Sequence, residues 1–138
     1  MPLTDYRTLG RSGLIVSPLS LGTMTFGTPG WGSSDEDSAT IFNEYTNTGG
    51  NFIDTADVYA GGRSEELLGG YIGQRKLRNE LVLATKFGFG GSPDNFGANT
   101  GRPNPHNGGN GRKHIYQALE GSLRRLGTDY IDLYWLHV

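Results

Sequence analysis

Hydrophobic residues along the chain switch between a spacing typical of strands and one typical of helices. Short apolar runs recur, and each is followed by a stretch in which apolar residues return every three or four positions. This alternation favours right-handed βαβ units and a parallel sheet. The predicted strands cover residues 19–23, 51–55, 81–86 and 130–136.

Three helices are predicted between these strands. The first begins at Ser34, an N-cap residue followed by three acids that complement the helix dipole, and it ends at Gly49. The second begins at Ser64. The third is marked by apolar residues from Ile115 to Leu126 and ends at Gly127.

Two segments fall outside this alternation. Near the start, residues 6–9 and 14–17 flank a turn-prone Gly-Arg-Ser-Gly sequence and predict a β-hairpin that can cover one end of the fold. Residues 88–111 are rich in Gly, Asn and Pro, and so long a connection is either a functional lid or disordered. Because this insertion follows the carboxyl end of a strand, where loops build the active sites of barrels, we favour a loop on the substrate side.

Composition is that of one soluble domain. The chain has 138 residues, of which 35% are hydrophobic, and a net charge of -2. There is no run of about five like charges, so neither nucleic acid nor an anionic membrane is indicated as a partner. The sequence has no cysteine, its start lacks the features of a signal peptide, and no apolar stretch approaches the roughly 20 residues that span a bilayer. A cytoplasmic protein is therefore expected.

Polar residues stand where successive predicted strands end. Because side chains alternate between the two faces of a strand, Asp54, Lys86 and His137 each continue an apolar row on one face of the sheet. Neighbouring strands lie about 4.8 Å apart, so these side chains can meet at one edge. Tyr59 follows Asp54 by five residues and can fold back over the same edge. The four residues therefore predict a single site.

This set of side chains suits acid–base chemistry on an oxygen atom. A carboxylate beside a lysine holds the ammonium in place, and a cation beside a phenol favours its ionised form. Tyr59 is then the proton donor, and His137 can orient a substrate by hydrogen bonding to its oxygen. The combination fits protonation of an oxygen that gains negative charge, as happens when hydride reduces a carbonyl group.

Taken singly, each of these residues has a simpler explanation. Asp54 alone is more typical of a turn or N-cap and Lys86 of a charge at a strand end. His137 alone fits a satisfied buried histidine, and Tyr59 fits an aromatic at the edge of a core with a solvated hydroxyl. Only their common register favours catalysis.

Four further residues carry weaker signals. His106 and His114, in or beside the insertion, are predicted to be solvated, and without carboxylate partners they do not predict a metal site. Phe26 and Trp31 lie on a predicted loop. They can line an apolar substrate pocket, or they can be ordinary exposed aromatics.

Several segments of the chain, in order, resemble the N-terminal half of an aldo-keto reductase. They are LSLGTMTFG, NFIDTADVY followed by SEELLG, LVLATKFGF and ALEGSLRRLGTDYIDLYWLH. The resemblance implies that residues 1–138 form the N-terminal portion of an aldo-keto reductase domain, a (β/α)8 TIM barrel opened by a β-hairpin, with four parallel strands in this chain. It also implies NADP(H)-dependent reduction of an aldehyde or ketone. The segment RKHI and the long loop before it look closest to the bacterial and potassium-channel-β-like branch.

The resemblance also implies a role for particular residues. It puts Asp54, Tyr59, Lys86 and His137 at the positions of the family's catalytic tetrad. It puts Gly22, Thr23 and Met24 near the nicotinamide and ribose of the cofactor, and Asp54 beside them.

The position of His137, one residue before the last, adds an expectation about the whole protein. The resemblance assigns most of the grip on the pyrophosphate and 2'-phosphate to later strands, so we expect this chain to be a truncated product or a partial record of a longer reductase. Four strands would leave sheet edges and apolar rows uncovered, which favours self-association. The alternatives to a reductase are a catalytically inactive fragment and a nucleotide-sensing regulatory subunit.

Overall fold

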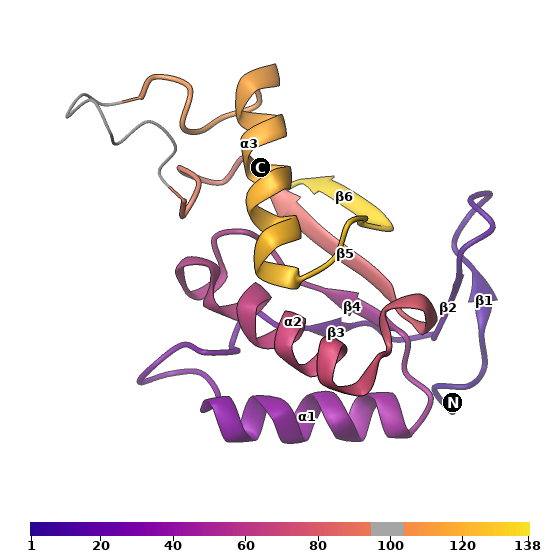
Figure 1. Cartoon of the computed structure of the whole chain (residues 1–138). Coiled ribbons are helices and arrows are strands. Elements are labelled where there is room, and N and C mark those ends of the chain that lie inside the picture. The colour runs from indigo at the N-terminus through magenta and orange to yellow at the C-terminus, as the bar shows by residue number, and fades with distance from the viewer. Residues whose placement is uncertain (95–103) are drawn as a thin grey trace.

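A computed structural model describes residues 1–94 and 104–138 of the chain. Their order is hairpin, strand, helix, strand, helix, strand, helix, strand (Figure 1). The strands and helices are β1 (Arg7–Thr8), β2 (Ile15–Val16), β3 (Leu21–Gly22), α1 (Asp35–Asn47), β4 (Phe52–Asp54), α2 (Arg63–Arg75), β5 (Val82–Phe87), α3 (Arg112–Leu126) and β6 (Leu133–Leu136), with short 3-10 turns η1 (Tyr59–Gly62) and η2 (Arg78–Glu80).

The main sheet has four parallel strands in the order β3-β4-β5-β6. Spatial order therefore follows chain order, and each crossover carries a helix. The three helices lie on one face of the sheet (Figure 1). In the register, Asp54 is opposite Ala84, and Lys86 is opposite Trp135. Both charged side chains thus belong to the face that the helices do not cover.

The hairpin lies at the amino ends of the strands, opposite the predicted site. Strands β1 and β2 pair antiparallel, as the turn sequence predicts. The side chain of Asn51, just before β4, fixes the hairpin: its Oδ1 accepts from the amide of Ser17 at 2.7 Å, and its Nδ2 donates to the carbonyl of Ile15 at 3.0 Å. The hairpin therefore contributes no side chain to the other end of the sheet.

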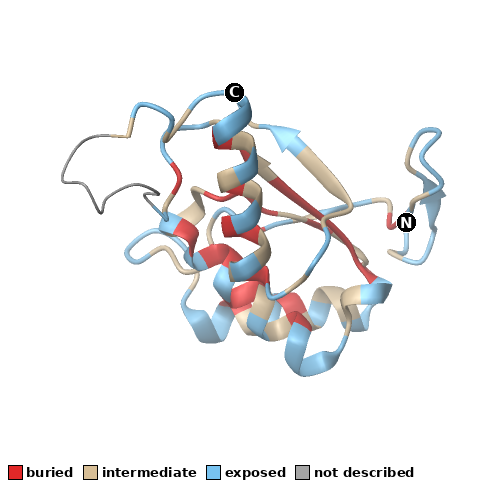
Figure 2. Ribbon diagram, turned by 45° about the horizontal axis from the view of Figure 1, so that its top comes forward, coloured by how far each residue is buried: buried red, intermediate tan, exposed pale blue. Residues whose placement is uncertain are grey.

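The core fills the space between the sheet and the helices, where buried residues concentrate (Figure 2). Phe26 is 1% exposed and packs in this core, so neither interpretation of it as a pocket-lining or exposed loop aromatic is correct. Trp31, by contrast, is 62% exposed. The buried apolar cluster comprises Phe26, Phe42, Ile53, Leu67, Leu68, Ile72, Leu81, Leu83 and Leu126.

Helices α2 and α3 approach closely at a glycine. A Cβ atom at Gly69 would lie 2.5 Å from the carbonyl oxygen of Arg125, so only glycine permits this contact. The end of α3 also follows its sequence signal, because Gly127 caps it in the left-handed conformation with φ of 62°. Ser34 likewise caps α1, accepting from the amide of Asp37 at 3.0 Å.

Strand β6 begins three residues later than its apolar pattern predicts. Arg78 holds the preceding segment in place: its guanidinium donates to the carbonyl of Tyr130 at 2.7 Å and pairs with Asp132 at 2.9 Å. Asp132 also accepts from the amide of Leu83 through its carboxylate at 2.9 Å. Side chains therefore replace part of the backbone ladder there, and regular pairing starts at Leu133.

The insertion is described at its two ends, 88–94 and 104–111, which contain turns and bends. Its central residues, 95–103, lie outside the described residues, so its prediction as a substrate-side loop stays a prediction. Within the described ranges, no helix is long and apolar enough to cross a membrane. The same ranges contain no group of three or more His, Cys, Asp or Glu side chains placed to hold a metal ion.

Candidate active site

Lys86 is the centre of the polar cluster at the carboxyl edge of the sheet. Its ammonium donates three hydrogen bonds: to Asp54 Oδ2 at 2.6 Å, to the carbonyl of Thr55 at 2.6 Å and to Tyr59 Oη at 3.1 Å. An ammonium has three donors, so all of them are engaged. The Lys86 and Asp54 side chains are 14% and 28% exposed, a charged pair in contact with solvent on one side.

Tyr59 reaches this cluster because the backbone after β4 continues to pair with β5. The amide of Thr55 donates to the carbonyl of Ala84 at 3.0 Å, and the amide of Asp57 donates to the carbonyl of Lys86 at 3.2 Å. The chain then turns at η1, and the Lys86 ammonium lies 4.8 Å from the Tyr59 ring centre. The phenol oxygen accepts from Lys86, so its own proton is directed to another acceptor.

The residue after Tyr59 has an unusual backbone conformation. Ala60 has φ of 50° and ψ of 35°, in the left-handed region that a side chain disfavours. Such strain, of order 1–3 kcal/mol, persists only where the surroundings impose it, and it concentrates at functional sites. Here it belongs to the tight turn η1, which joins Tyr59 to the start of α2.

His137 lies beside Tyr59 at the end of β6. Its amide donates to the carbonyl of Phe87 at 2.8 Å, and its ring meets the Tyr59 ring edge-on with the ring centres 5.7 Å apart. The Phe89 ring centre lies 5.4 Å from the His137 ring centre. Burial, together with the positive charge of Lys86, lowers the pKa of His137, and Asp54 offsets part of this effect. The imidazole is therefore neutral near pH 7 and carries one N–H donor.

The three residues assigned to the cofactor by resemblance differ in their surroundings. Gly22 and Met24 are exposed, and a Cβ at Gly22 would meet nothing within 4 Å. Thr23 is fully buried: its hydroxyl lies 2.9 Å from the hydroxyl of Ser64, and its amide donates to the carbonyl of Asp54 at 3.0 Å. Thr23 thus holds β3 and α2 around Asp54, whereas Gly22 and Met24 leave open surface beside it.

The four sequence-predicted residues therefore come together as one group of an acid, a lysine, a phenol and a neutral imidazole. Residues 18–138 match the model of the Aldo/keto reductase family. The chain belongs to this family.

Individual relatives agree with this assignment. A norsolorinic acid reductase from Aspergillus flavus is 44% identical over 132 residues, which cover 92% of this chain and 33% of that protein. A voltage-gated potassium channel subunit beta from Arabidopsis thaliana is 38% identical over 137 residues, covering 96% of this chain and 37% of that protein. A solved aldo-keto reductase from Pseudomonas aeruginosa aligns with a TM-score of 0.76 at 34% identity, covering 100% of this chain and 48% of that one.

These similarities confirm the predicted fold class. The chain has the α/β architecture of half an aldo-keto reductase barrel, with a leading hairpin and four parallel strands. The predicted relationship to the potassium-channel-β-like branch is confirmed as well. The chain spans about a third of the length of the curated relatives it matches and about half of the solved barrels.

Sequence reasoning missed a second polar cluster in this aldo-keto reductase chain, on the other face of β5. Glu65 of α2 is fully buried, accepts from Thr85 Oγ1 at 2.6 Å and pairs with Arg125 of α3 at 2.7 Å. Arg125 also binds Asp94 at 2.6 Å. The alternation of side chains along β5 is the signal that could have revealed this cluster, because it places Thr85 on the face opposite to Lys86.

Asp57 joins the same buried region. It is 1% exposed, and its Oδ1 has no hydrogen-bond partner among the described residues. Burial raises the pKa of Asp57 to about 6, the charge of Glu65 adds to this effect, and Arg125 opposes it. Asp57 therefore keeps its proton to a higher pH than an ordinary aspartate does, and it lies two residues before Tyr59 in the chain.

His114 also differs from its prediction. It is 1% exposed instead of solvated, because it lies on the inward stripe of α3 with Ala118 and Ser122. The spacing of four residues between these positions was the available signal. His106 is exposed, as predicted.

Proposed function

We propose that the whole protein to which this chain belongs reduces an aldehyde or ketone to an alcohol with NADP(H). The observation that carries the proposal is the triple hydrogen bonding of Lys86 to Asp54, Thr55 and Tyr59. It fixes the ammonium against the phenol oxygen and leaves the phenol proton free to be donated. A general acid held in this way suits a carbonyl oxygen that is gaining negative charge.

The residues beside Asp54 fit the nicotinamide end of the cofactor. Gly22, at the end of β3, has open space around it, and Met24, two residues later, offers an exposed thioether side chain. A nicotinamide cofactor supplies the hydride when it is bound. The role of this chain is to hold Asp54, through Thr23 and Lys86, at the rim of that surface.

His137 is proposed to orient the carbonyl group. A neutral imidazole can donate an N–H to the substrate oxygen without competing with Tyr59 as a stronger acid. The His137 and Tyr59 ring centres are 5.7 Å apart, so a substrate oxygen between them could accept from both side chains. Two donors converging on one oxygen both position the substrate and stabilise the charge that develops there.

The test is to replace Tyr59 by Phe in the whole protein. Tyr59→Phe removes only the hydroxyl, so we expect NADPH oxidation with an aromatic aldehyde to be abolished while NADPH binding persists. Tyr6→Phe is the matched control, because Tyr6 is a half-exposed hairpin residue that donates to Gly49. Unchanged turnover in Tyr59→Phe would refute the proposed acid.

A second candidate is a nucleotide-sensing regulatory subunit, favoured by the 38% identity to a potassium channel subunit beta. The two candidates differ in turnover. A reductase oxidises NADPH in the presence of a carbonyl compound, through many turnovers and at a rate proportional to the enzyme concentration. A sensor binds NADPH and oxidises at most one equivalent. Absorbance at the NADPH band with excess nucleotide distinguishes them.

A further inference from the structure

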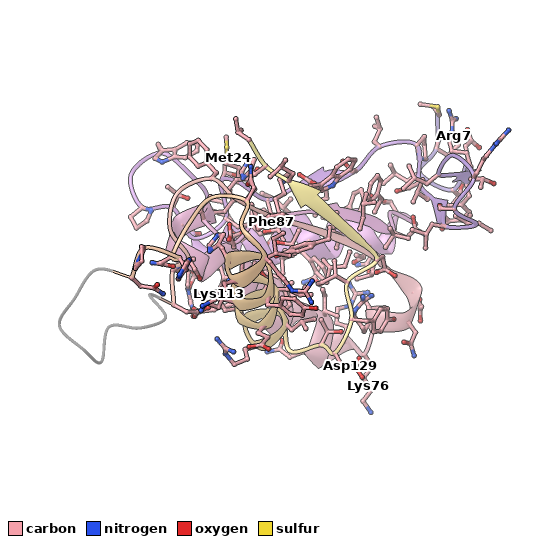
Figure 3. The ribbon with its side chains drawn as sticks, turned by 90° about the horizontal axis from the view of Figure 1, so that it is seen from above. Arg7, Met24, Lys76, Phe87, Lys113 and Asp129 are labelled. Atoms are coloured by element: carbon pink, nitrogen blue, oxygen red, sulfur yellow. The ribbon has the colours of Figure 1, made fainter. Side chains whose placement is uncertain are left out.

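A cavity of about 460 Å³ opens at the start of α3, outside the Asp54–Tyr59–Lys86–His137 cluster. Residues 111–114 form one wall, and Pro105, His106 and Gly108 of the preceding loop form the rest. Figure 3 shows Lys113 where α3 meets this loop. All of these residues belong to the described part of the chain, and none of them is acidic.

The helix start itself offers unused donors. Gly111 is the N-cap residue and provides no side-chain cap, and the first turn contains no acid. The first backbone bond of the helix runs from the amide of Ile115 to the carbonyl of Gly111. The amides of residues 112–114 therefore precede the helical ladder and point out of its positive end.

His114 supplies an independent indication of a ligand. It lines the cavity and is 1% exposed, yet neither ring nitrogen has a hydrogen-bond partner among residues 1–94 and 104–138. A buried polar group without a partner costs about 1–3 kcal/mol. Burial also lowers the pKa of His114, so the ring is neutral near pH 7 and has one N–H to donate. A bound acceptor would remove the cost.

The charges around the cavity define the acceptor. Arg112 and Lys113 are exposed at its rim, and Arg112 stacks its guanidinium over the Tyr116 ring at 5.3 Å from the ring centre. We propose that the start of α3 binds a phosphate group through the amides of residues 112–114, the His114 imidazole and the Arg112 and Lys113 side chains. A phosphate has enough acceptor oxygens for these donors and enough charge for two cations. A cavity of this size accepts inorganic phosphate or a small phosphate ester.

The experiment is a titration of the chain with inorganic phosphate, followed by amide NMR shifts at constant ionic strength set with chloride. We expect saturable shifts at residues 112–114. The double variant Arg112→Ala/Lys113→Ala should weaken binding about tenfold or more, the loss of two charge-assisted contacts. Arg7→Ala/Arg11→Ala, which removes two exposed charges in the hairpin, is the matched control and should bind as the unchanged chain does.

A second variant separates binding from folding. His114→Leu removes the unpartnered ring nitrogens, so without phosphate it should be at least as thermally stable as the unchanged chain. Phosphate should then raise its melting temperature less. Tighter binding of methyl phosphate than of inorganic phosphate assigns the site to an ester, and the reverse assigns it to the free ion. Absence of saturation with either probe, or equal binding by the site and hairpin double variants, overturns the proposal.

Discussion

The two faces of β5 carry two charged pairs of similar length but opposite surroundings. On one face Lys86 and Asp54 are 2.6 Å apart, with side chains 14% and 28% exposed. On the other, Arg125 and Glu65 are 2.7 Å apart, with side chains 8% and 0% exposed. Adjacent residues, Thr85 and Lys86, belong to the two clusters.

The difference between the clusters is in what their hydrogen bonds leave available. Glu65 is bound by Thr85 and Arg125, and Arg125 in turn is bound to Asp94, so this cluster joins α2, α3 and the insertion. Lys86 instead donates to Asp54, Thr55 and Tyr59, all at the carboxyl edge of the sheet. The Tyr59 oxygen is the acceptor in this bond, so the phenol proton stays available for a substrate. We therefore expect the first cluster to determine stability and the second to determine chemistry.

The largest effect is expected from Arg125→Met. Removing the cation leaves Glu65 buried and unpaired, which typically costs about 3–5 kcal/mol. Urea denaturation followed by circular dichroism measures the loss. Arg63→Met is the matched control, because the Arg63–Asp35 pair has side chains 47% and 57% exposed and should cost less than about 1 kcal/mol. Equal losses of unfolding free energy in Arg125→Met and Arg63→Met would contradict the expectation that the buried pair stabilises the fold more than an exposed pair does.

Lys86→Met should impair activity more than stability, the opposite of what we expect for Arg125→Met. It removes the cation next to Tyr59 but keeps an unbranched side chain, so kcat/KM for an aromatic aldehyde in the whole protein should fall by about 10²–10³. The free energy of unfolding should change by much less than in Arg125→Met. Lys76→Met, at the exposed end of α2, is the control for activity. A Lys86 variant that loses stability but keeps its kcat/KM would show that the comparison is wrong.

The sequence predicted the open cluster better than the buried one, for a physical reason. Asp54 and Lys86 end apolar rows on strands, so the period of two defines their face from local pattern alone. The bond between Glu65 and Arg125 joins residues 60 positions apart on two helices, and nothing in the spacing of either helix reports the packing of the other. Parity of β5 identifies the face of Thr85 but not its partner.

Element boundaries show the same limit. Gly127 and Ser34 predicted helix ends because their effect is local. The start of β6 could not be predicted, because Arg78, more than 50 positions away in the chain, holds Tyr130 in place. His114 was misjudged because the buried residues that follow it at a spacing of four on α3, Ala118 and Ser122, are small, and Ser122 is polar, so the apolar periodicity is weak there.

The next effect concerns pH. The pKa of Asp57 rises from 3.8 to about 6 on folding, so between these values the folded state binds a proton that the unfolded state has lost. Its contribution to stability is therefore fully present below about pH 4, is lost as pH rises to about 6 and stays lost above. Asp57→Asn should remove this loss, so its stability relative to the unchanged chain should rise by about 2–3 kcal/mol across this window. Urea denaturation of both proteins at pH 4, 5, 6 and 7 measures the difference between their free energies of unfolding. A difference that stays constant over this range would show that Asp57 does not titrate there.

The smallest effect distinguishes strain at the site from strain at a helix end. Ala60 and Lys76 are both non-glycine residues at positive φ, 50° and 56°, but Ala60 follows Tyr59 whereas Lys76 caps α2. Glycine has no Cβ atom and so removes the steric cost of a positive φ at either position, but it also raises the conformational entropy of the unfolded chain. Ala60→Gly and Lys76→Gly should therefore each stabilise the folded state by only about 0.5 kcal/mol. Only Ala60→Gly should lower kcat/KM, by a few fold, because a freer turn holds Tyr59 less firmly against Lys86. Equal effects of the two variants on kcat/KM would mean that the strained turn serves folding and has no part in positioning the phenol.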